Sequence, residues 1–189
     1  MSQAATGRVR WTIADVDLLA ADEWKRYEII DGELFVTRAP HWGHQNTIDN
    51  ICAELRAWSQ STGRGRAVST PGIIFTETDS VIPDVVWIST SRLTVLLDEA
   101  GHLTGAPELV VEVLSLGTTN ERRDKEAKLK LYSIQGVQEY WIVNWQLQQV
   151  EVYRRENAQL VRVATLLVGD EITSPLLPDF CCPIERFFA

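Results

Sequence analysis

The fold is decided by three consecutive segments, PELVVEVLS (107–115), NERRDKEAKLKLYSI (120–134) and EYWIVNW (139–145). The first and third are short runs rich in β-branched and aromatic residues, which are typical of strands. The middle segment has apolar residues at helical spacing and is followed by Gly136, a residue that commonly ends helices. We therefore predict a strand, a helix and a second strand.

The flanking sequence extends this alternation of strands and helices. Thr12 can cap a short helix over 12–24, and Asp31-Gly32 is a strong hairpin signal within YEIIDGELFVT (27–37). The other expected elements are a long helix over 44–61, strands over 67–76 and 80–89, a brief helix over 91–99 and a hairpin over 148–167. This order predicts an α/β fold, a mixed sheet flanked by helices, with an N-terminal helix and hairpin and a C-terminal hairpin.

Charge and hydropathy limit the classes of function. The chain of 189 residues has 18 Lys and Arg against 26 Asp and Glu, a formal net charge of −8, which argues against a surface wholly devoted to nucleic acid but allows a local basic site. The apolar runs are far shorter than the roughly 20 residues of a membrane-spanning helix, and a secretory signal is lacking. We expect a cytoplasmic protein with no membrane partner. Since no linker divides the chain, we predict a single domain over 1–189, with its core over about 25–145.

Two acidic residues interrupt apolar strands. Alternation places Asp84 on one strand face with Ile82 and Val86, and it places Glu112 on one face with its apolar neighbours at 110 and 114. A partly buried carboxylate needs a compensating partner. Each acid could be satisfied by an arginine or a backbone donor, or both could converge on one hard cation, for which carboxylate oxygens are natural ligands.

Lys128 is the lysine of the 120–134 helix that is most expected to face the sheet. At about 100° per residue it falls in one stripe with Asp124, Ala127, Leu131 and Tyr132. A buried lysine requires an acid or an anionic ligand. The alternative is a surface ion pair between Asp124 and Lys128, four residues apart.

Two acids that hold a divalent ion beside a lysine can hydrolyse phosphodiesters. The ion polarises the phosphoryl oxygen and lowers the pKa of a bound water. The lysine can orient or deprotonate that water, or stabilise charge that develops in the transition state.

Six motifs in order support this chemistry by resemblance. The motifs are Tyr27 to Glu33 (YEIIDGE), His44 at the start of the long helix, Pro83-Asp84, Val111 to Ser115 (VEVLS), Asp124 with Lys128 and Tyr132, and Gly136 to Trp141 (GVQEYW). Together they resemble the PD-(D/E)XK nuclease superfamily, and within it the Uma-type family of bacterial putative restriction endonucleases, over about residues 12–189.

The resemblance implies a role for each of these residues. Asp84 and Glu112 would bind Mg²⁺ or Mn²⁺, and Lys128 would act on the water or the phosphate. Glu28 would assist by completing the coordination of the metal; the alternative is that it simply faces solvent. Asp124 and Tyr132 would orient Lys128 and cover the site. Independently of the resemblance, His44 could bind a phosphate at the start of the long helix, where free N–H groups favour anions, or it could be a capping or packing histidine.

Two positions depart from the pattern of the resemblance. The superfamily usually has a lysine two residues after the glutamate, where this chain has Leu114; Lys128 would take over that role. The loop after the strand usually reads S-P-S-T, and here it reads Ser115-Leu116-Gly117-Thr118.

The implied activity is a metal-dependent endonuclease that acts on nucleic acid, with DNA as the expected substrate. A homodimer is expected, because cutting both strands of a duplex normally takes two sites; Trp141 and Trp145 are candidates for its interface. A basic stretch over 120–130, together with Arg64 and Arg66, could contact the polyanion or could be a solvated helix face. The alternatives are a non-catalytic module that binds nucleic acid or protein, and a hydrolase of another phosphoester.

Overall fold

The computed structural model describes residues 9–19, 25–115 and 123–189. Its helices are α1 (Ile13–Asp17), α2 (Trp42–Thr62), α3 (Thr90–Leu96), the π-helical η1 (Arg123–Lys128), α5 (Leu129–Gln135) and the 3₁₀-helical η2 (Ile184–Phe187). Its strands are β1 (Arg26–Ile30), β2 (Glu33–Thr37), β3 (Gly65–Ser69), β4 (Ile73–Thr76), β5 (Asp79–Val81), β6 (Val85–Ser89), β7 (Leu109–Val113), β8 (Glu139–Asn144), β9 (Gln149–Glu156), β10 (Gln159–Leu167), β11 (Glu171–Ser174) and β12 (Leu177–Pro183).

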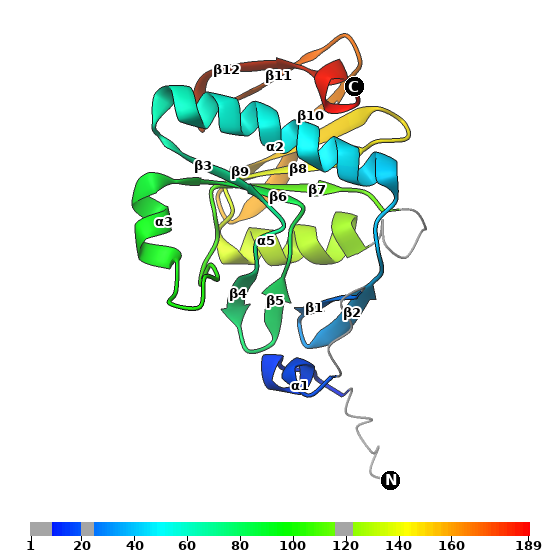
Figure 1. Cartoon of the computed structure of the whole chain (residues 1–189), viewed down its shortest axis with the longest axis vertical. Coiled ribbons are helices and arrows are strands. Elements are labelled where there is room, and N and C mark those ends of the chain that lie inside the picture. The colour runs from blue at the N-terminus through cyan, green and yellow to red at the C-terminus, as the bar shows by residue number, and fades with distance from the viewer. Residues whose placement is uncertain (1–8, 20–24, 116–122) are drawn as a thin grey trace.

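A six-stranded mixed sheet forms the centre of the molecule, in the order β10-β9-β8-β7-β6-β3 (Figure 1). β7 and β8 run parallel, which requires a crossover connection such as the one that contains η1 and α5, and the other neighbours are antiparallel. The predicted α/β fold is confirmed, with its N-terminal helix and hairpin (α1, β1, β2) and the hairpin β9–β10.

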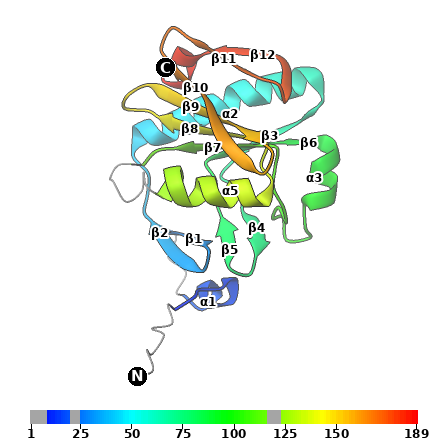
Figure 2. The same cartoon turned by 180° about the vertical axis from the view of Figure 1, so that it is seen from behind.

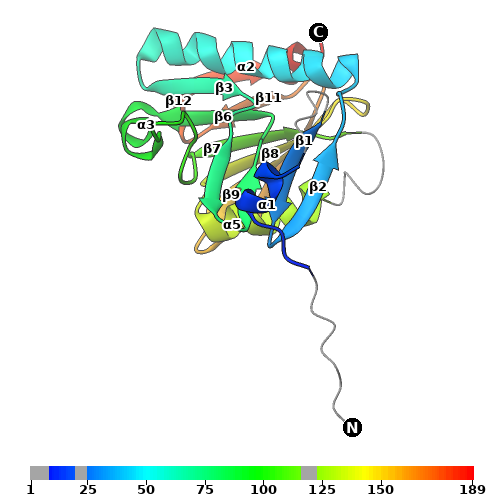
Figure 3. The same cartoon turned by 60° about the horizontal axis from the view of Figure 1, so that its bottom comes forward.

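Helical layers cover both faces of this sheet. α2 lies across one face, with the small β11–β12 sheet beside it, and α5 lies against the other face (Figures 1 and 2). A second sheet, in the order β2-β1-β5-β4, stands beyond the edge of the α5 layer and projects toward the viewer in Figure 3. No helix within the described ranges is long and apolar enough to cross a membrane.

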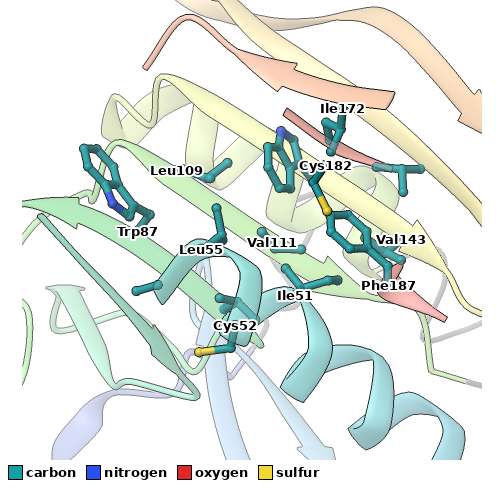
Figure 4. Close-up of a cluster of buried hydrophobic side chains, with 14 of the residues drawn as sticks. Ile51, Cys52, Leu55, Trp87, Leu109, Val111, Val143, Ile172, Cys182 and Phe187 are labelled. Carbon is teal, nitrogen blue, oxygen red and sulfur yellow. The ribbon is translucent and has the colours of Figure 1, made fainter. Parts of the chain in front are cut away.

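The two faces of β7 serve two different cores. Val111 and Val113 point into the α2 core, which Figure 4 shows with Ile51, Leu55 and Phe187. Val110 and Leu114 belong to the opposite core, where α5 packs. Glu112 stands between Val110 and Leu114 in the alternation, and it therefore points toward α5.

Two of the predicted strands are each broken in two. The 67–76 segment forms β3 in the large sheet and then β4 in the small one. The 80–89 segment forms β5 in the small sheet and then β6 in the large one. Thr70, at φ 51°, begins the first break, before Pro71 and Gly72. Pro83 lies in the second break and cannot donate a ladder hydrogen bond. Asp84 thus lies just before β6 and not within a strand, which corrects the prediction.

The helices also begin at different residues from those predicted. His41, not His44, precedes α2, and its Nδ1 accepts a hydrogen bond from the N–H of Gly43, so His44 lies in the first turn. Gly63 ends α2 with φ 67°, as predicted. The 120–134 helix contains a π-helical turn before α5, and its first three residues lie outside the described ranges.

Candidate active site

Asp84 occupies the corner where the chain enters the large sheet. Its Oδ2 accepts a hydrogen bond from the backbone N–H of Val113 at 2.8 Å, and its carbonyl accepts one from the N–H of Thr70 at 3.0 Å. Two neighbouring segments therefore hold this residue beside β7. It is buried, with 6% of its surface exposed.

Glu112 projects from β7 into the layer between the sheet and α5. Its Oε1 accepts hydrogen bonds from Lys128 Nζ at 2.9 Å and from the Tyr132 hydroxyl at 2.8 Å. Val113, the next residue in β7, holds Asp84 by its N–H, so the strand fixes the two acids relative to each other.

Lys128 is 1% exposed and lies where the helical stripe predicts. Its Nζ is 2.9 Å from Oε1 of Glu28, 2.9 Å from Oε1 of Glu112 and 3.8 Å from Oδ1 of Asp124. The contact with Asp124 is the longest of the three, and both partners are buried. The alternative of a surface pair between Asp124 and Lys128 is therefore wrong.

Glu28 enters the site from β1 of the small sheet. Besides Lys128, its Oε1 accepts a hydrogen bond from the backbone N–H of Ile82 at 2.9 Å, in the segment that leads to Asp84. Glu28 thus ties the small sheet both to η1, through Lys128, and to the corner that carries Asp84.

Arg123 belongs to the site although the sequence placed it in a basic surface stretch. It is 7% exposed, its Nε donates to Asp124 Oδ1 at 2.9 Å, and its guanidinium lies 3.7 Å from Oε2 of Glu28. On an α-helix Arg123 would point about 100° away from Asp124. Its long side chain nevertheless reaches both Asp124 and Glu28, so the guanidinium lies in the site.

The buried side chains carry an excess of negative charge. Within the described ranges, the buried cluster contains four carboxylates, those of Glu28, Asp84, Glu112 and Asp124, and two buried lysine or arginine cations, Lys128 and Arg123. Their formal charges sum to minus two.

This excess is reflected in the pKa values of the two central acids. Burial, with Asp84, Asp124 and Glu28 nearby, raises the pKa of Glu112 to about 8, although Lys128 opposes the shift. Burial also raises the pKa of Asp84 against the opposing effects of His44 and Lys128.

Lys128 and Glu28 are held in their charged forms. Burial alone would lower the pKa of Lys128, but Glu112, Glu28 and Asp124 outweigh it and raise that pKa. Burial would raise the pKa of Glu28, but Lys128, Arg123 and the Ile82 N–H outweigh it, and the pKa falls below its usual value.

His44 completes the wall of the site on the α2 side. Its Nε2 lies 2.8 Å from the Val113 carbonyl, to which it donates, and 3.5 Å from Oδ2 of Asp84. Its Nδ1 is buried and has no hydrogen-bond partner among the residues that the structure describes. His44 is therefore a packed histidine and not the helix cap, and it keeps one ring nitrogen unpaired.

These side chains line one pocket of about 410 Å³, its opening included. Its walls are formed by Arg26, Glu28, Thr37, Arg38, Pro40, His44, Ile82, Asp84, Glu112, Ser115, Arg123 and Lys128. Arg26 and Arg38 add cations at the outer part of a pocket whose floor is acidic, an arrangement suited to an anionic substrate above a cation.

The other predicted functional residues lie elsewhere. Arg64 and Arg66 follow the C-terminal end of α2, whose first turn carries His44, so about 30 Å of helix separates them from the site. Trp141 is completely buried between Phe180 and Phe187, which excludes it from a subunit interface. The Leu116–Gly117 departure lies outside the described residues.

A divalent ion fits the donor set as a site with two protein ligands. Within the described ranges no group of three or more His, Cys, Asp or Glu side chains is arranged to hold a metal ion. Among the described residues, the side-chain hydrogen bonds and ion pairs of Asp84 use Oδ2 and those of Glu112 use Oε1, so Oδ1 and Oε2 have no partner in this part of the chain. Mg²⁺ is commonly bound by one or two carboxylates, with waters and substrate phosphate as its other ligands.

A mixed sheet between helical layers, with two carboxylates and a lysine at its centre, defines a protein with the restriction-endonuclease-like fold. The model of the Uma2 family, described as "putative restriction endonuclease", matches residues 13–185. The chain therefore belongs to this family. A search of curated proteins found no match.

A solved structure shares the fold over nearly the whole chain. It is a crystal structure of a "putative nuclease belonging to DUF820" from Anabaena variabilis ATCC 29413, with a TM-score of 0.72 and 19% sequence identity. The alignment covers 94% of this chain and 97% of the other. At that identity the likeness shows the fold alone.

Proposed function

We propose that this protein is a divalent-metal-dependent endonuclease that hydrolyses phosphodiester bonds in nucleic acid. Membership in the Uma2 family supports the reaction class. The observation that carries the proposal is the buried cluster, in which the four carboxylates exceed Lys128 and Arg123 by two charges. A buried excess of this size is relieved by protons or by a divalent cation.

Asp84 and Glu112 are the proposed metal ligands. They come from adjacent segments of one sheet, and each has a carboxylate oxygen that is not used by the described hydrogen bonds. A bound Mg²⁺ or Mn²⁺ supplies polarisation of the scissile phosphoryl oxygen and a more acidic water.

Lys128 acts as a fixed positive charge in this proposal. Its pKa is raised, so it stays protonated and does not serve as the base that deprotonates the water. An ammonium held between Glu28 and Glu112 can instead stabilise negative charge on the phosphate in the transition state. Glu28 and Asp124 position Lys128, Tyr132 orients Glu112, and His44 holds Val113 and Asp84.

The substrate proposed is a nucleic acid, with DNA as the first polymer to test. The outer arginines of the pocket, Arg26 and Arg38, can receive phosphates next to the scissile one. A homodimer stays a prediction.

Calorimetric titration of Mn²⁺ and Mg²⁺ into the purified protein tests the metal site. We expect about one ion per chain for the wild type, and loss of binding in Asp84→Asn and in Glu112→Gln while both remain folded by circular dichroism. Glu139→Gln is the matched control, because Glu139 is a buried carboxylate in the same sheet whose partners are Trp141, Ser174 and Arg154. This control should bind metal as the wild type does.

A hydrolysis assay with Mn²⁺ on labelled DNA and RNA then tests the reaction. We expect cleavage by the wild type, and a loss of at least a hundredfold in Lys128→Ala with metal binding retained. Metal binding that persists in both folded acid variants would overturn the two-carboxylate site. It would favour a module that kept the fold without the chemistry.

A further inference from the structure

A groove leads out of the candidate active site between β2 and α2. It is lined by Val36 to His41, His44, Ser115 and Trp145, and it measures about 1050 Å³ with its opening included. It shares Thr37, Arg38, Pro40, His44 and Ser115 with the active-site pocket. A polymer whose phosphate lies in the pocket can therefore continue into this groove.

Two aromatic rings form the outer wall of the groove. His41 stacks on Trp145, with the ring centroids 4.8 Å apart and the planes 18° from parallel. Trp145 is half-buried, and His41 is exposed to solvent. The stacked pair thus lines a groove that continues from the pocket of Asp84 and Glu112.

The backbone of α2 fixes this pair in place. A Cβ atom at Gly43 would lie 2.7 Å from the Trp145 ring, so the ring can sit against the helix only because residue 43 is glycine. His41 is held by its cap hydrogen bond to Gly43. The stack is therefore formed before any ligand arrives, which lowers the ordering cost of binding.

We call the stacked His41 and Trp145 rings the platform. Polar groups near the platform and the pocket suit a phosphodiester chain. Arg38 is exposed and lines both cavities, which supplies a cation midway along the path. The first turn of the 21-residue α2 lies at the same wall, and its N–H groups favour anions. There the buried His44, which lines both cavities, keeps Nδ1 without a partner among the described residues.

We propose that the groove binds an unpaired nucleotide next to the scissile phosphate, and that the substrate of this site is a single-stranded segment of nucleic acid. The inference rests on the proposed nuclease function and names its substrate class. The base stacks on the His41–Trp145 pair, and the adjoining phosphate contacts Arg38. In a duplex the bases are paired and stacked on one another, so their faces are not free for the platform.

Fluorescence anisotropy of a 5′-fluorescein strand of twelve deoxythymidines tests the proposal, in EDTA so that binding is measured apart from hydrolysis. We expect this strand to bind at least tenfold more tightly than the same strand paired with its complement. A strand of twelve uridines separates DNA from RNA, and tight binding of either single strand supports the proposal.

Four variants isolate the platform. Trp145→Ala should weaken binding of the single strand about tenfold, and Trp145→Phe, which keeps an aromatic ring, should stay within about threefold of the wild type. His41→Ser removes the ring but retains a good helix cap, and should also weaken binding about tenfold. Leu147→Ala, at an exposed position in the same β8–β9 turn, is the control and should have no effect.

The possible outcomes separate this inference from the proposed function. Duplex that binds as tightly as single strand, or binding unchanged in both His41→Ser and Trp145→Ala, would overturn the inference. In that case, equal cleavage of duplex DNA by the wild type and by Trp145→Ala with Mn²⁺ would show that the proposed nuclease function still holds although the single-strand inference fails. A wild type that neither binds nor cuts any of these nucleic acids would overturn both.

Discussion

Lys128 contacts three buried carboxylates with its single ammonium group. Glu28 and Glu112 both approach its Nζ to 2.9 Å, and Asp124 lies 3.8 Å away. Such an ammonium supplies charge to the site and holds three elements together, namely β1, β7 and the η1–α5 helix. Its removal should therefore affect stability as well as activity.

Lys128→Met should lower the free energy of unfolding at pH 7 by about 3–5 kcal/mol, because it leaves buried carboxylates without their cation. Urea denaturation followed by circular dichroism measures the loss. Lys130→Met is the matched control: Lys130 is exposed and lies 3.9 Å from an exposed Asp31, so the change should stay within about 0.5 kcal/mol. Equal effects of the two substitutions would contradict the buried ion cluster.

The raised pKa of Glu112 predicts how stability depends on pH in the metal-free protein. The pKa is about 8 in the folded protein and 4.5 for an ordinary glutamate, so between these pH values the folded protein holds a proton that the unfolded chain has released. The stabilisation is complete below about pH 4.5 and is lost as pH rises through 8.

Glu112→Gln should flatten this decline, which we expect to be on the order of 2–4 kcal/mol. Denaturation in EDTA at pH 5, 7 and 9 measures it for both proteins. The wild type should lose stability relative to the variant as pH rises; a constant difference between them would show that Glu112 titrates normally.

At the scale of single elements, the sequence predicted which face of a helix or strand a residue occupies better than it predicted where the strands break. The stripe that selected Lys128 depends on helical periodicity, and the placement of Glu112 depends on strand alternation; both patterns are local and regular. The buried position of Arg123 depends on its contacts with Asp124 and with Glu28, which is distant in the sequence, and no spacing in the sequence marks that contact. Asp84 was expected within a strand because VIPDVVWI reads as one, although Pro83 lies at the break between β5 and β6.

The pairing of β3 with β6 provides a prediction at this scale, because Gly65 is opposite Ser89 in that ladder. A Cβ atom at Gly65 would lie 2.4 Å from the backbone oxygen of Ile88. We expect Gly65→Ala to lower the free energy of unfolding by about 2–3 kcal/mol, since a backbone atom must shift.

Gly63→Ala is the comparison for this change. Gly63 has open space around it but a φ of 67°, so alanine there should cost only about 1 kcal/mol. Thermal denaturation of the two variants ranks them, and a smaller loss for Gly65→Ala would show that the β3 edge yields easily.

At the scale of the whole molecule, the site lies where three parts meet: the large sheet, the small sheet and the α5 layer. Glu112 comes from the first, Glu28 from the second and Lys128 from the third. Sequence patterns identify the hairpin, the strands and the helix that carry these residues, but they predict one sheet and do not show the separate small sheet. Only the family resemblance implied that the residues share one site. The β11–β12 sheet had no comparable signal, yet its residues close the core on the α2 face.

Because β11, β12 and η2 close this core, we expect η2 to be important for stability. Phe187 is completely buried and stacks on Trp141, which belongs to the strand parallel to the one that carries Glu112. Phe187→Ala should therefore lower the free energy of unfolding by about 3–5 kcal/mol.

The control for this prediction is Val163→Ala. Val163 is exposed on β10, so the substitution should change the free energy of unfolding by less than about 0.5 kcal/mol. Urea denaturation followed by tryptophan fluorescence checks both values. If Phe187→Ala has as little effect as Val163→Ala, the C-terminal segment is an appendage to the sheet and not part of the core that supports the site.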